Sequence, residues 1–226
     1  MDRETYRQIE AYMLECMQDS AHDKDHVYRV LYGAMSIARD ETVEDMDVLI
    51  AACLLHDIAR AEQMADPRVC HAQAGALKAY EFLLRMGWPE AKASHVRECI
   101  RTHRFRKGEP PCSIEAKILY DADKLDVVGA IGLARTLCYN GAMNEPIYST
   151  APDGTILDGS GEEPDSFCRE YRFKLEKVYD RFLTPAGAAL ASSRRQAAED
   201  FYRAVLDEVR GTLAQGSDVL RSAIEE

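Results

Sequence analysis

The sequence predicts an all-α protein. Apolar residues recur at the three- and four-residue spacing of amphipathic helices through most of the chain, as at Tyr6, Ile9 and Met13. The sequence shows no convincing β-alternation and no internal repeat. The helical pattern is interrupted over residues 139–166, which are rich in glycine and proline. We therefore expect a helical bundle with one irregular loop insertion.

Helix-starting and helix-ending residues bound several of the expected helices. Gly87 suits the position after a helix and Pro89 the first turn of the next one. Ser113 is a suitable N-cap, after a loop over residues 104–111. The run 48–55 could be a strand by composition, but its alanines and its helical phase favour a buried helix. The expected helices cover about residues 6–17, from 20–25 to 38, 48–55, 70–86, 90–103, 113–138, 167–182 and 186–209.

Length and composition indicate one soluble globular domain. The chain has 226 residues, which is enough to bury a hydrophobic core, and no linker separates it into self-sufficient halves. Apolar residues make up 46% and charged residues 30%, a balance typical of folded soluble proteins. We expect a single domain over residues 1–226, with a core at about 20–138, the loop insertion at about 139–166 and further helices at about 167–210.

The net charge and the cysteines indicate which kinds of ligand the protein binds and which cellular compartment it occupies. The net charge of −11 disfavours long nucleic acid, and a small anionic ligand would need a local positive site. Seven scattered cysteines without a C-x-x-C motif argue against disulfides and against a zinc ribbon. The N-terminus lacks a signal peptide, and the longest apolar run is too short to span a bilayer. We therefore expect a cytoplasmic protein with no membrane partner; a homodimer is compatible with the sequence.

Two histidines and two aspartates are candidates for holding a divalent metal. His26 lies in the second expected helix, His56 and Asp57 end a very apolar helix, and Asp123 lies in another apolar helix. Imidazoles combined with carboxylates suit Mn, Fe, Ni, Co or Zn, and Mg less well. Four such ligands leave about two octahedral positions for water and a substrate oxygen. Taken alone, His56 and Asp57 could instead be a helix-terminal cation beside a solvated carboxylate.

Four sequence blocks in this order resemble the HD superfamily of metal-dependent phosphohydrolases. The blocks are His26-Val-Tyr-Arg-Val, Leu55-His-Asp-Ile-Ala-Arg-Ala-Glu, Ile100-Arg-Thr-His-Arg and Asp121-Ala-Asp-Lys-Leu-Asp-Val-Val-Gly-Ala-Ile-Gly. The chain looks most like the small stand-alone bacterial members, some of which are nucleotide pyrophosphohydrolases. The similarity covers most of residues 20–210, including the loop Pro146-Ile-Tyr.

The resemblance implies a metal centre and a reaction. By it, His26, His56, Asp57 and Asp123 are the ligands of one divalent ion, manganese among the candidates. The ion would lower the pKa of a water and polarise a phosphoryl oxygen. The expected reaction is hydrolysis of a phosphate ester or anhydride, in a nucleotide.

Basic and acidic neighbours of these residues are expected to take part in the reaction. The transition state of phosphoryl transfer carries spread negative charge, which Arg60 and Lys124 would stabilise. Related enzymes suggest that Glu62 orients or deprotonates the water. Arg60 and Glu62 could instead form an ordinary surface pair. Asp121 and Asp126 either orient a ligand or Lys124, or face outward.

Other side chains are expected to face the substrate, and here alternatives stay open. We expect this of Arg29, His71, His103 and Arg104, whereas His22 and His95 are expected to be structural or exposed. In some HD proteins, extra histidines bind a second metal; no paired histidines precede Asp123 here, so we expect one. The alternatives are a di-iron HD-type oxygenase and a non-catalytic nucleotide sensor. The loop over 139–166 is either an active-site lid or a disordered insertion.

Overall fold

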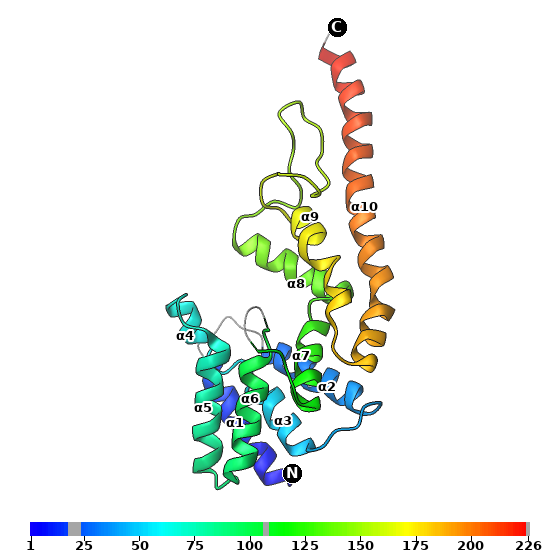
Figure 1. Cartoon of the computed structure of the whole chain (residues 1–226). Coiled ribbons are helices and arrows are strands. Elements are labelled where there is room, and N and C mark those ends of the chain that lie inside the picture. The colour runs from blue at the N-terminus through cyan, green and yellow to red at the C-terminus, as the bar shows by residue number, and fades with distance from the viewer. Residues whose placement is uncertain (18–23, 106–108, 225–226) are drawn as a thin grey trace. The chain divides into compact units, whose positions relative to one another are not determined.

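The computed structural model describes residues 1–17, 24–105 and 109–224, and they are mainly helical (Figure 1). Within these ranges the β-type pairing consists of one isolated bridge, between Thr150 and Ile156. The predicted all-α class is therefore confirmed. The expected helix start between 20 and 23, His22, and part of the 104–111 loop lie outside the described residues. None of the described helices is long and apolar enough to cross a membrane.

The chain forms two compact units. The first unit comprises residues 1–126 and 182–190, and the second comprises residues 127–181 and 191–226. A single domain over residues 1–226 stays a prediction, because two compact units can still fold cooperatively as one domain.

The first unit is a helical bundle built around α3. α5 packs along α6 and α2 along α7, while α3 contacts α1, α2, α6 and α7. This central position explains why the run 48–55 is almost wholly apolar, and it confirms the helix expected there. The helices are α1 (Arg3–Cys16), α2 (Lys24–Ala38), α3 (Met46–Leu55), α4 (Arg60–Ala65), α5 (His71–Arg85), α6 (Glu90–Thr102) and α7 (Ile114–Leu125). The short helix α4 was not expected from the sequence.

The second unit has its own aromatic core. The rings of Tyr171 and Tyr202 stack with their centroids 4.1 Å apart, and Phe167 and Leu206 are buried beside them. The elements are α8 (Gly129–Ala142), α9 (Phe167–Glu170), the π-helical turn η1 (Tyr171–Leu175), the 3-10 turn η2 (Val178–Arg181) and α10 (Pro185–Ile224), whose first residues belong to the first unit.

Three expected helices are wrong in their extent. The helix expected over 113–138 is broken, since α7 ends at Leu125 and α8 begins at Gly129. Gly129 has a φ of +64°, a left-handed conformation that does not continue an α-helix. The region 167–182 is not one regular helix, because α9 gives way to the turns η1 and η2. α10 also continues to Ile224, well past the expected end near residue 209.

Backbone and side-chain hydrogen bonds give the loop over residues 143–166 a defined conformation. The amide of Phe167 donates to the carbonyl of Pro146, and the Arg210 guanidinium donates to the carbonyl of Ile156. Gly159 has a φ of +83°, and a Cβ there would lie 2.2 Å from the carbonyl oxygen of Cys168. The close approach of this loop to α9 therefore requires glycine at this position.

Asp121 holds the chain where α10 begins. Its carboxylate accepts hydrogen bonds from the amides of Leu183 (2.8 Å) and Thr184 (2.7 Å), and from the Thr184 hydroxyl (2.7 Å). Thr184 in turn caps the helix, because its Oγ1 accepts from the amide of Gly187. Of the two roles expected for Asp121, neither is seen among these contacts, and its bonds serve the helix start.

We expect Asp121→Ala to lower the free energy of unfolding by about 2–3 kcal/mol, because two amide donors lose their acceptor. Urea denaturation followed by circular dichroism measures this. Asp40→Ala removes an exposed carboxylate of the same unit and is the control. A loss no larger than that of the control would show that the carboxylate does not hold the helix start.

Candidate metal centre

Six side chains meet where helices of the first unit begin or end. This placement brings backbones from distant parts of the sequence to one point, since each helix contributes a terminal turn. The side chains are His26 in the first turn of α2, His56 and Asp57 after α3, His71 at the start of α5, His103 after α6, and Asp123 in the last turn of α7.

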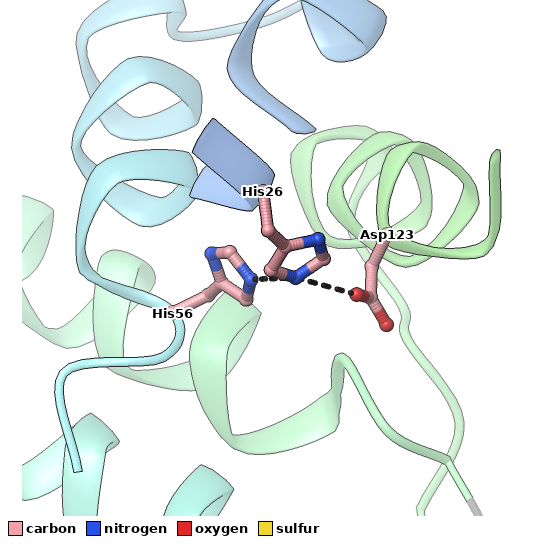
Figure 2. A group of neighbouring side chains, drawn as sticks. All are labelled: His26, His56 and Asp123. Carbon is pink, nitrogen blue, oxygen red and sulfur yellow. Dashed lines mark hydrogen bonds and ion pairs between the residues drawn. The ribbon is translucent and has the colours of Figure 1, made fainter. Parts of the chain in front are cut away.

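His26, His56 and Asp123 form one group that could hold a metal ion (Figure 2). The Nε2 atoms of the two histidines are 3.3 Å apart, and His26 Nε2 is 3.4 Å from Asp123 Oδ1. Both histidines are buried, whereas the Asp123 side chain is 24% exposed. The group is thus enclosed on the histidine side and open to solvent at the aspartate.

Asp57 lies between this group and a second pair of histidines. Its Oδ2 is 3.6 Å from His26 Nε2 and 3.7 Å from His56 Nε2. Its Oδ1 is 3.2 Å from His71 Nε2 and 3.7 Å from His103 Nε2. The structure therefore brings together the four residues expected as ligands, and it adds His71 and His103 through the second oxygen of Asp57.

All four histidines are oriented by an acceptor at Nδ1. A carboxylate or carbonyl oxygen only accepts, so an Nδ1 bonded to one carries the hydrogen, and in a neutral imidazole Nε2 then directs its lone pair toward the centre. The acceptors are Asp126 Oδ2 for His26 (2.7 Å), the Cys53 carbonyl for His56 (2.7 Å), Gln63 Oε1 for His71 (2.5 Å) and the Ile100 carbonyl for His103 (2.6 Å). His71 Nδ1 also lies 3.3 Å from the Arg104 guanidinium, which only donates, so the neutral tautomer is set for His26, His56 and His103.

This donor set fits a divalent cation. Asp57 Oδ1 and His71 Nε2 are buried and have no hydrogen-bond partner among the described residues, although they face each other. They could pair only if His71 Nε2 carried a hydrogen, and burial lowers the pKa of His71, which disfavours the doubly protonated ring. Ligand atoms about 2.0–2.2 Å from one ion lie roughly 3 Å apart, close to the spacings seen here. A cation would therefore satisfy groups that otherwise face one another as acceptors.

The electrostatics of the centre separate His26 from the other histidines. Burial lowers the pKa of His56, and it lowers that of His103 to about 3. Burial also opposes charge on His26, but Asp123 and Asp57 together outweigh it and raise its pKa. Burial likewise opposes charge on Asp57, yet its histidine neighbours, led by His56, hold its pKa well below the usual range. Without an ion, His26 is therefore the histidine of this centre that takes up a proton most readily.

We expect the affinity for a divalent ion to fall as the pH falls, because the ion must displace the proton from His26. Below the raised pKa of His26, the loss should be about tenfold per pH unit for one released proton. Calorimetric titration with Mn²⁺ between about pH 5 and 8, in buffers of different ionisation enthalpy, counts the protons released. An affinity independent of pH over that range would contradict this role of His26.

Two basic side chains lie beside the centre, and a third, Lys124, follows the candidate ligand Asp123 in the chain. Arg60 Nε donates to Asp57 Oδ2 (2.9 Å), and the Arg104 guanidinium lies 3.3 Å from His71 Nδ1. Lys124 Nζ lies 3.7 Å from the centroid of the Tyr120 ring. The centre thus has positive charge nearby in a chain whose net charge is negative.

Two other predicted site residues are bonded to protein side chains. Arg29 donates to both oxygens of Asp126, from Nε (2.6 Å) and from an Nη atom (3.1 Å). Glu62 accepts from Lys78 Nζ, and this bond outweighs burial and lowers the pKa of Glu62. Asp126 therefore orients a candidate ligand, as one of its two expected roles states. The roles of Arg29 and Glu62 toward substrate stay predictions.

The sequence analysis did not identify three groups that accept hydrogen bonds from the histidines, namely Gln63 and the carbonyls of Cys53 and Ile100. Both carbonyls lie three residues before the histidine that they orient, so a histidine directly after a helix was an available signal. Gln63 had no such signal, because its contact with His71 depends on how α4 meets α5. His95, expected to be structural, lies 3.3 Å from the buried Glu115.

Comparison with known proteins identifies a family match in the part of the chain that holds the centre. The HD domain family matches residues 24–128, a range that includes all six side chains of the centre. The match ends two residues after Asp126, which orients His26.

Similar proteins extend the likeness beyond the HD domain. YpgQ from Bacillus subtilis (strain 168) is 28% identical over 204 residues, which is 88% of this chain and 90% of YpgQ. An HD-superfamily hydrolase from Bacillus thuringiensis is 27% identical, with a TM-score of 0.72 over 92% of this chain and 98% of its own. A predicted HD-superfamily hydrolase from an uncultured Thermotogales bacterium is 29% identical, with a TM-score of 0.58 over 92% and 91%. At the general level, these similar proteins support a hydrolase.

Proposed function

We propose that this protein is a metal-dependent phosphohydrolase that acts on nucleotides. The observation that carries the proposal is the buried centre, in which His26 Nε2 lies 3.3 Å from His56 Nε2 and 3.4 Å from Asp123 Oδ1. His26, His56, Asp57 and Asp123 would hold the ion. When bound, a divalent ion supplies a water of lowered pKa and positive charge for the phosphoryl oxygens.

The basic side chains would bind and stabilise the phosphate. Arg60 bonds to Asp57, Lys124 follows Asp123 in the chain, and Arg104 lies beside His71. A fixed guanidinium or ammonium stabilises spread negative charge without reorganisation during the reaction. Arg29 would act on His26 through Asp126, because it donates hydrogen bonds to both carboxylate oxygens of Asp126.

Glu62 would position the attacking water rather than deprotonate it. Its bond to Lys78 lowers its pKa, and a carboxylate of lowered pKa is a weaker proton acceptor. An oriented carboxylate oxygen can still fix a water by accepting its hydrogen bond.

The nucleotide part of the proposal is supported by a relative. B. subtilis YpgQ has a crystal structure in complex with ADP, and its sequence is similar to this chain over most of both lengths. The negative net charge agrees with a small ligand rather than a nucleic acid.

A release assay tests the proposal. Protein loaded with Mn²⁺, Ni²⁺, Co²⁺ or Mg²⁺ is incubated with nucleoside mono-, di- and triphosphates, and phosphate and pyrophosphate are measured separately. We expect turnover with at least one pair of ion and nucleotide. No turnover with any pair, from protein shown to contain metal, would reject it, and tight binding without turnover would favour a nucleotide sensor.

A second candidate is a two-metal centre, as in a di-iron oxygenase. The observation that favours it is Asp57 Oδ1, which faces His71 and His103 on the side away from the first group. Metal analysis of the wild type, His71→Ala and His103→Ala distinguishes the two-metal centre from the single-metal hydrolase. One ion per chain in all three proteins supports the single-metal hydrolase. Two irons in the wild type, falling to one in the variants, would support the alternative.

A further inference from the structure

Phe105 lies just after the end of α6. It follows His103 of the metal centre and Arg104, which lies beside that centre. His103 faces Asp57, Arg104 lies beside His71, and Phe105 follows with 40% of its surface exposed. Its φ is +22°, a backbone conformation that bulky side chains rarely adopt. Such a conformation is retained where the surrounding structure or a function requires it.

The ring of Phe105 rests against a buried aromatic side chain. Its centroid is 6.3 Å from that of Tyr120, and the two ring planes are inclined by 59°. Tyr120 is only 4% exposed, and Lys124 Nζ lies over its ring. Tyr120 thus supports one side of Phe105, and 40% of the Phe105 surface is exposed to solvent.

Chain geometry keeps this ring close to the metal centre. Phe105 is the second residue after His103, so their Cα atoms lie at most about 7 Å apart. On α7, Tyr120 precedes Asp123 by three residues, a rise of about 4.5 Å along the helix. A ribose and its phosphates can bridge a separation of this size. The exposed ring, Lys124 and Arg104 therefore offer an aromatic surface and positive charge within one nucleotide's length.

Phe173 provides a contrast within the same chain. It is 48% exposed, but the Arg169 guanidinium lies 4.5 Å and Lys177 Nζ 5.1 Å from its centroid. Its ring is thus already engaged by two cations of the second unit. Phe105 has an aromatic support instead, beside a centre proposed to take phosphate.

We propose that Phe105 is the surface on which the base of the substrate stacks, with the phosphates at the metal centre. This rests on the proposed function and extends it to base recognition. Stacking against an aromatic side chain accepts every base and requires no hydrogen-bond pattern. The site would therefore distinguish nucleotides from inorganic phosphates more strongly than it distinguishes one base from another.

Binding to full-length, Mn²⁺-loaded protein tests this. Dissociation constants for ADP and for inorganic pyrophosphate are measured by calorimetry for the wild type, Phe105→Ala, Phe105→Trp and Phe173→Ala. We expect Phe105→Ala to weaken ADP on the order of tenfold and to leave pyrophosphate within about twofold. Phe105→Trp should keep ADP affinity, and ADP should quench its fluorescence where the wild type, whose lone tryptophan is Trp88, shows no change. Phe173→Ala should match the wild type.

The outcomes separate this inference from the proposed function. If Phe105→Ala weakens neither ligand, or both equally, stacking on Phe105 is wrong while the phosphohydrolase proposal stands. If metal-loaded wild type binds neither ADP nor pyrophosphate, both proposals are wrong. Should Phe105→Ala fail to fold, Phe105→Leu keeps apolar bulk without an aromatic face, and it should weaken ADP alone.

Discussion

Asp57→Ala is expected to abolish metal binding and hydrolysis together. Asp57 is the one carboxylate whose two oxygens face different histidine pairs, at distances of 3.2–3.7 Å. Its removal takes one of four proposed ligands and leaves four imidazoles without the negative charge between them. We expect the metal content to fall below about one tenth of an ion per chain and turnover to fall on the order of 1000-fold or more.

Metal analysis after gel filtration and the phosphate release assay measure the two effects on one preparation. Asp57→Asn keeps the shape of the side chain but removes its charge, so it separates the loss of a ligand from a packing defect. Asp40→Ala removes an exposed carboxylate of the same unit and should change neither quantity. Activity that survives in folded Asp57→Ala would mean that the proposed ligand set is wrong.

Asp126→Asn is expected to weaken metal binding about 10- to 100-fold, although Asp126 is not a proposed ligand. Asp126 is buried, accepts from His26 Nδ1 and is held by Arg29. An asparagine offers only one acceptor oxygen, so its amide would face either the imidazole or the guanidinium as a second donor. The tautomer and orientation of His26 would then no longer be fixed.

Competition against a chromogenic chelator measures this affinity, and urea denaturation measures the stability of the same variant. Asp121→Ala is the matched comparison, because Asp121 is also a buried carboxylate of α7 but contacts the start of α10. We expect Asp121→Ala to lose stability and keep its metal affinity, whereas Asp126→Asn should mainly lose metal affinity. The opposite pattern would contradict the assignment of the two carboxylates.

Much of the helical architecture could be predicted from the sequence, because local signals set it. The run 48–55 is so apolar that only a central helix could bury it, and Gly87 with Pro89 marks the turn between α5 and α6. The break after α7 could not be predicted in the same way. Leu125 and Val127 continue the apolar pattern, and the left-handed Gly129 ends it through a backbone angle that composition does not reveal.

The sequence by itself determined which residues could form a metal centre, since His26, His56, Asp57 and Asp123 stand in blocks whose order is a property of the chain. Only the tertiary structure decided which of these side chains contact one another. It placed Asp57 between two histidine pairs, Asp126 against His26, and Asp121 away from both. The reason is physical: helix periodicity specifies the face on which a side chain lies, whereas the meeting of helix ends depends on how five helices pack around one core.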